Sequence, residues 1–128
     1  MGRGGPGNLD SDAAFEHMSD VCDQIISRIE QTASNDRLME PDEFESEAMI
    51  LDIDILIALN AAKLLMTVPD SSDVARWETN YLRVWDEYIS SLTNDEAYVR
   101  ERRKVISDSF DRLLAISIDW HGQPPVTE

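Results

Sequence analysis

Apolar residues recur at alternating steps of three and four along the first part of the chain, which predicts an amphipathic helix. Ser11 or Asp12 can cap its start, and Ser34-Asn35-Asp36 marks its end. The predicted helix therefore runs from Asp12 to Ala33. Its apolar stripe consists of Phe15, Met18, Cys22, Ile25 and Ile29.

A second predicted helix begins near Pro41 and is apolar on nearly every side up to Met66. A helix of this kind is usually the most buried one of its domain. The segment around Asp52 and Asp54 also alternates with period two, as a strand would. We favour the helix because the apolar run continues without a turn signal and no other segment offers a partner strand.

Two more amphipathic helices follow a break at residues 67–72. Thr93-Asn94-Asp95-Glu96 has the form of a capping box and starts the last helix, which ends near His121. Four helices with short connections predict an all-α, single-domain antiparallel four-helix bundle over residues 1–128. Residues 1–10 form a predicted Gly-rich loop, and residues 122–128 a tail. The third helix carries Val74, Trp77, Tyr81, Val84 and Tyr88 at helical spacing.

The N-terminal segment resembles a family of small bacterial proteins, domain of unknown function 4259, whose members begin Met-Gly-x-Trp-Gly-x-Gly-x-Phe-x-Asn-Asp-x-Ala-x-Asp. Leu9 stands for the Phe of that pattern and Glu16 for its last Asp, while Gly4 replaces the Trp and Ser11 the Asn. The resemblance implies an all-α fold and an ordered N-terminal loop at the mouth of the first helix. It implies no activity. The matching residues are Gly2, Gly5, Gly7, Asp12 and Ala14.

The charge balance is strongly acidic, with 26 Asp and Glu residues against 11 Lys and Arg and a formal net charge of −15. Such a field repels phosphate backbones and anionic lipids, so we expect neither a nucleic-acid nor a membrane partner. It favours encounters with basic proteins, and it also keeps a small protein in solution. Cys22 is the only cysteine, which excludes an intrachain disulfide and suits a reducing compartment. With no apolar signal segment at the start, we expect a cytoplasmic protein.

No motif for catalysis or metal binding is complete. The glycines at the start lack the strand and the Gly-Lys-Ser/Thr of a phosphate loop, and Asn8, Asp10 and Asp12 lack the later ligands of a calcium loop. Asp52 and Asp54 resemble the Asp-x-Asp of a phosphatase superfamily, but on a helix the two side chains diverge. We therefore expect no cofactor, no metal and no catalytic residue.

Two kinds of site residue stand out. Asp54 is predicted to lie deep in the bundle, where a carboxylate needs a cation, and Arg76, Arg83 or Arg112 could supply it. Trp77 and Trp85 lie about 80° apart on a helix. One of the two can therefore be buried while the other is exposed and anchors a partner.

The basic run from Arg100 to Lys104 suits a second structural role. Because its charges wrap around the helix, it cannot form one nucleic-acid-binding face, and it can instead hold neighbouring acidic helices together.

These patterns favour a non-enzymatic protein-binding module that engages a basic protein through an acidic, partly aromatic surface. An immunity or antitoxin-like role would suit its size and charge. The alternative from another class is a small metal-dependent hydrolase that uses a carboxylate cluster. A third reading is a homo-oligomer in which a second copy covers the apolar second helix.

Overall fold

The computed structural model describes residues 5–122, and within that range every regular element is helical. The predicted all-α helical bundle is confirmed. The predicted tail beyond Gly122 and the glycines before Gly5 lie outside the described residues. The elements are α1 (Asp12–Ala33), a 3₁₀ turn η1 (Asp36–Met39), α2 (Phe44–Ala61), α3 (Ser71–Tyr88), a 3₁₀ turn η2 (Ile89–Ser91) and α4 (Glu96–His121).

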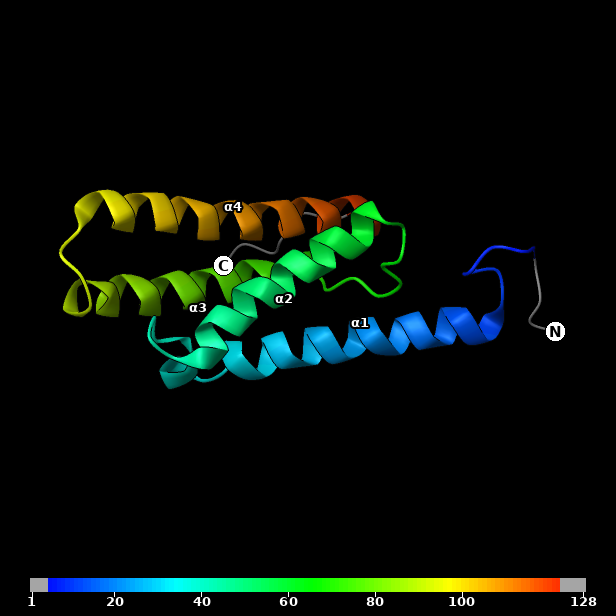
Figure 1. Ribbon diagram of the computed structural model, residues 1–128, viewed down its shortest axis with the longest axis horizontal. Helices are drawn as coiled ribbons and strands as arrows, with labels where there is room; N and C mark the ends of the chain where they lie inside the picture. Colours follow the sequence, from blue (N-terminus) through cyan, green and yellow to red (C-terminus); the bar gives the residue numbers. More distant parts are fainter. Residues whose placement is uncertain (1–4, 123–128) are drawn as a thin grey trace.

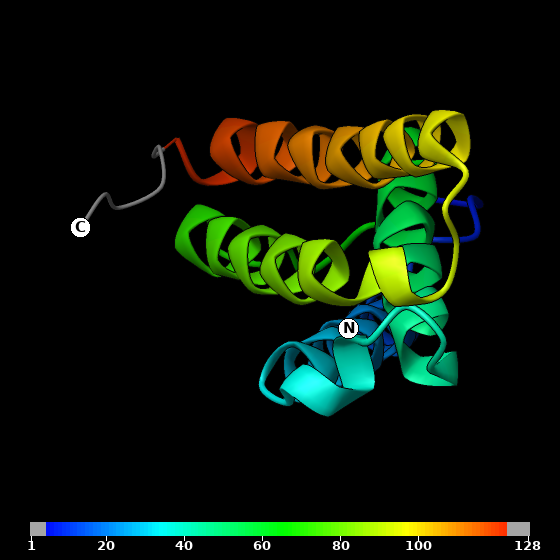
Figure 2. The same cartoon turned by 90° about the vertical axis from the view of Figure 1, so that its left-hand side faces the viewer.

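Three of the helices form a stack, and the fourth crosses it. In Figure 2, α4, α3 and α1 lie one above another, and α2 runs along one edge of the stack. Figure 1 shows α2 passing obliquely across the other helices, so that it contacts α1 at one end of the stack and α4 at the other. The N-terminal end of α1 extends beyond the rest of the molecule.

The helix termini follow the local sequence. Ser11 caps α1 as predicted, because its side chain accepts a hydrogen bond from the Ala14 N–H. At α4 the capping residue is Asp95, which accepts from the Tyr98 N–H, rather than Thr93 of the expected capping box. Thr93 instead accepts from the Asp95 N–H, so both residues stabilise the same turn.

The second helix ends earlier than expected. It stops at Ala61 instead of Met66, because Lys63 adopts a left-handed backbone conformation with φ of 62°. The Leu64 N–H then donates to the Leu59 carbonyl oxygen, which closes the helix in a Schellman-type turn. Leu65, beyond this turn, is still buried, and that burial explains why the apolar run outlasts the helix.

The core contains the interior faces of all four helices and includes one buried polar junction. Cys22 is fully buried, as expected for a small core residue. The Ser46 hydroxyl lies 2.9 Å from the Tyr81 hydroxyl and donates to the Met39 carbonyl oxygen. Burial raises the pKa of Tyr81 to about 12, so the phenol remains neutral and can take part in this junction.

Substituting Lys63 tests the turn that ends α2. Lys63→Gly removes the Cβ strain of the left-handed conformation, so we expect it to stabilise the protein by roughly 1 kcal/mol. Lys63→Ala is the matched control, because it removes the same charged side chain but keeps the Cβ. Urea unfolding of the two variants measures the difference, and equal stability of the Gly and Ala variants would contradict the assignment.

Candidate interaction surfaces

Both tryptophans expected near an interface are buried. Trp77 is 1% exposed and Trp85 3%, so the prediction that one of them is an exposed anchor is wrong. The angle of about 80° between them does not separate a buried from an exposed side, because both lie within the broad buried face of α3, which contacts α1, η1 and α4. The exposed tryptophan is Trp120 (53%), near the end of α4, outside the aromatic stripe on which the expectation rested.

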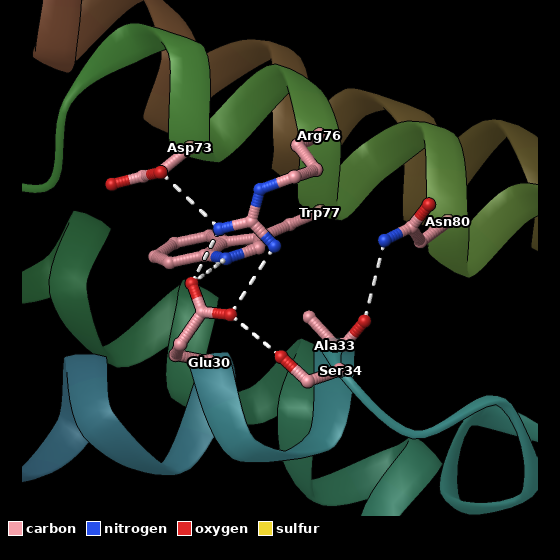
Figure 3. Close-up of polar contacts among 7 residues, drawn as sticks. All are labelled: Glu30, Ala33, Ser34, Asp73, Arg76, Trp77 and Asn80. Atoms are coloured by element: carbon pink, nitrogen blue, oxygen red, sulfur yellow. Dashed lines mark hydrogen bonds and ion pairs between the residues drawn. The ribbon is translucent and has the colours of Figure 1, made fainter.

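Trp77 has a structural role at the junction of α1 and α3, which Figure 3 shows. Its indole N–H donates to the Glu30 carboxylate at 3.1 Å, and Arg76 Nη1 binds the same carboxylate at 3.2 Å. Ser34 Oγ adds a third donor at 2.7 Å. These hydrogen bonds, that from Arg76 above all, outweigh partial burial and lower the pKa of Glu30 to about 2.

Asp54 is not the buried carboxylate of α2, so that prediction is also wrong. Asp54 is exposed and accepts a hydrogen bond from Ser109 Oγ at 2.8 Å, and no arginine within residues 5–122 pairs with it. The buried carboxylate is Asp52, which Arg28 of α1 binds through Nε at 3.1 Å and Nη2 at 2.9 Å. A buried carboxylate of α2 does have an arginine partner, but that carboxylate is Asp52. The helix directs residue 52 toward α1 and residue 54 toward α4.

The basic run of α4 holds acidic helices together, as expected. Arg102 binds Glu47 of α2 at 3.4 Å, and Arg103 binds Asp86 of α3 through two hydrogen bonds of 2.9 Å. Each of these pairs is exposed and adds little stability on its own. Together they fix how α4 lies against two other helices.

Carboxylates do not converge into a metal-binding set in the part of the chain that the structure describes: no three Asp, Glu, His or Cys side chains there could hold one ion. Asp54 and Asp108 line one groove beside Arg112, while His17 is exposed on α1. Between α3 and α4, burial and then the nearby Asp111 raise the pKa of Glu78, which is otherwise bound by Ser107.

The N-terminal end of α1 is an exposed acidic surface, although the predicted apolar stripe of this helix begins there at Phe15. Its buried residues begin only at Cys22, so Phe15 is 52% exposed instead of packed. Within residues 5–122 none of its four carboxylates forms an ion pair. The absence of any lysine or arginine from residue 8 to residue 27 is the signal in the sequence that points to this surface. We call this surface the acidic end of α1, and it comprises Asp12, Phe15, Glu16, Asp20 and Asp23.

A second exposed surface is apolar and lies on α2. Phe44 is 81% exposed, Leu51 61% and Ile55 42%. Their spacing continues the heptad-like steps of a single helix face. We call this surface the outer face of α2, and it comprises Phe44, Ala48, Leu51, Ile55 and Ala58.

The chain matches no protein-family model, no curated protein and no solved structure. The resemblance of its N-terminal segment to the family of unknown function therefore stays a prediction. Among the described helices, none combines the length and the apolar character that crossing a bilayer requires.

The Arg28–Asp52 pair gives a prediction about stability. Arg28→Gln leaves the Asp52 carboxylate buried without its cation, and we expect it to destabilise the protein by about 2 kcal/mol. Adding Asp52→Asn should restore much of that loss. Arg83→Gln, which breaks the exposed pair with Asp36, is the control and should cost less. A double variant as unstable as Arg28→Gln alone would contradict the burial argument.

Glu30 gives a prediction about pH. Its folded-state pKa is depressed, so its contribution to stability is present above its ordinary pKa and is lost as the pH falls toward 2. Because its side chain is 40% exposed, we expect Glu30→Gln to cost only about 1 kcal/mol at pH 7. Thermal unfolding from pH 7 to pH 2 should show this difference shrinking toward zero, whereas a constant difference would contradict it.

Proposed function

We propose that the protein is a non-enzymatic binding module whose partner is a basic protein, and that the acidic end of α1 is its contact surface. One observation carries the proposal: unpaired carboxylates line up beside an exposed phenylalanine on a helix end that extends past the rest of the molecule.

The carboxylates form one stripe. Asp12, Glu16, Asp20 and Asp23 follow one another at steps of four, four and three, which brings them to one side of α1. Within residues 5–122 none of the four forms an ion pair, whereas exposed carboxylates on other elements, such as Asp36 and Asp86, are bound by Arg83 and Arg103. The charges of this stripe are therefore free to meet cations of another molecule.

Repulsion between the carboxylates of the stripe destabilises the N-terminal part of α1. Like charges four residues apart destabilise a helix by roughly 0.2–0.5 kcal/mol per pair. The helix dipole compensates near the first turn, where Asp12 lies, but Asp20 and Asp23 are beyond its reach. Folding alone gives no reason for this arrangement, whereas binding a basic surface does.

Phe15 adds an apolar contact at the edge of the stripe. Its ring borders the carboxylates at Asp12, while Met18, which is only partly buried, follows it on the core-facing side of α1. Apolar anchors surrounded by charge are typical of interfaces, where the anchor supplies affinity and the charges supply rate and orientation. A partner with a basic, amphipathic segment would satisfy both halves of this surface.

One form of this function is inhibition. A small acidic protein that covers the basic, anion-binding face of its partner neutralises that partner, as immunity and antitoxin proteins do. The charge of −15 would speed such an encounter by electrostatic steering.

The test is capture of a partner from native lysate by the tagged protein, with washes at low and then high salt and identification by mass spectrometry. We expect one basic protein to be retained through the high-salt wash. Replacing the four stripe carboxylates by their amides should weaken retention about tenfold or more, because several charge contacts are lost together.

A matched control changes the same number of charges elsewhere. Amide substitution of four other exposed carboxylates should leave retention unchanged, and these are Asp42, Glu87, Glu101 and Asp119. Equal losses in both variants would mean that net charge alone attracts basic proteins. That result, or a partner lost entirely in high salt, would refute the proposal.

A further inference from the structure

The outer face of α2 lacks the polar residues that a solvent-facing helix carries. Its exposed stripe runs from Phe44 through Leu51 and Ile55 to Ala58 and contains no charged side chain; Glu47 and Asp54 lie only along its α4 side. Contiguous exposed apolar surface on a soluble protein marks a contact site. The face therefore requires a cover that the described residues 5–122 do not supply.

We propose that a second copy of this chain covers the outer face of α2, in an antiparallel arrangement about a two-fold axis near Leu51. The spacing of large and small residues supports this occupant. Leu51 lies midway between Phe44, the most exposed apolar side chain, and Ala58. A two-fold axis at Leu51 therefore sets the Phe44 ring of each copy against the alanine-rich end of α2 in the other, which includes Ala61 and Ala62.

The alanine end of α2 has room for that ring. A groove of about 340 Å³ lies between α2 and α4 there, with Ile57, Ala58, Ala61 and Val105 among its apolar lining. The side chain that protrudes and the groove that accepts it are thus both present on one copy. Such self-complementarity is what a closed two-fold contact requires.

The charges along the α4 side of the face are also self-complementary. Glu47 binds Arg102 and Asp54 binds Ser109, and both pairs span 55 residues, so α2 and α4 run in the same direction where they cross. When a two-fold axis makes the two α2 helices antiparallel, the α4 helices of both copies lie on the same side of the interface and run in opposite directions. Arg112, which forms no ion pair within residues 5–122 and lines the groove, falls opposite Glu47 of the second copy.

The available area sets the strength of the contact. The 18 residues of α2 span about 27 Å at 1.5 Å per residue. The outer face of α2 together with the adjoining groove beside α4 is about 20 Å wide. Two such faces bury roughly 1,100 Å² in total, at the low end for a specific interface. Each copy also carries a charge of −15, so the copies repel one another through water. We expect a dimer that forms at tens of micromolar and that salt strengthens.

The test uses the purified full chain alone, so its result is independent of any basic partner. Sedimentation velocity from 1 to 300 µM should show wild type passing from monomer to dimer, with a lower dissociation constant at 0.5 M than at 0.05 M salt. Leu51→Glu should weaken the dimer at least 30-fold. Leu92→Glu is the matched control, because Leu92 is similarly exposed but lies in the α3–α4 connection. It should change the dissociation constant less than twofold.

Cross-linking tests the antiparallel arrangement. Cys22 is fully buried, so an introduced cysteine is the reactive one. Mixed under oxidising conditions, Phe44→Cys and Ala58→Cys chains should form the mixed disulfide in preference to either homodimer. Preferential Phe44→Cys homodimers would indicate parallel packing and overturn the arrangement. A wild-type chain that stays monomeric at 300 µM in high salt, or equal effects of Leu51→Glu and Leu92→Glu, would overturn the dimer and leave the face to another partner.

Discussion

The large apolar surface of α2 is the constraint on which the rest of the structure depends. Met49, Ile53 and Leu56 place this helix in the core, while α1 and α4 flank it. The other three helices form a stack that α2 crosses, and they do not surround it as equal partners. Its one buried carboxylate, Asp52, is bound there by two hydrogen bonds from Arg28 of α1.

The few cations of the chain connect elements to one another. Arg76 binds Glu30 across the α1–α3 junction, and Arg83 binds Asp36 in η1. An acidic chain that uses its arginines in this way leaves its surplus carboxylates where no cation is within reach. The N-terminal end of α1 is the clearest such place. The charges that connect the helices and the charges proposed to bind a partner therefore lie on different parts of the molecule.

Helix positions followed from the sequence wherever a local signal decided them. Ser11 and the apolar stripe of α1 gave the bounds of that helix, because capping and periodicity are properties of neighbouring residues. The end of α2 did not follow from the sequence. The apolar pattern continues past the left-handed turn at Lys63, because residues such as Leu65 are still buried beyond the helix.

The site residues depended on tertiary packing, which periodicity cannot give. Helix geometry correctly separated Asp52 from Asp54, but only the position of Arg28 on another helix decides which carboxylate is buried. Trp77 and Trp85 both lie on the broad buried face of α3, and Phe15 belongs to a helix that extends past its neighbours. Both facts concern the lengths and crossing angles of helices, and no single stretch of sequence contains them.

The distribution of the three tryptophans also gives the molecule distinct optical environments. Trp77 and Trp85 are sealed in the core, and the Trp77 indole N–H points at a carboxylate, while Trp120 meets water near the end of α4. Indole emission moves to longer wavelength as the ring becomes hydrated. The fluorescence of the folded protein is therefore the sum of emission from two shielded rings and one hydrated ring. On unfolding, only the emission of Trp77 and Trp85 shifts to longer wavelength.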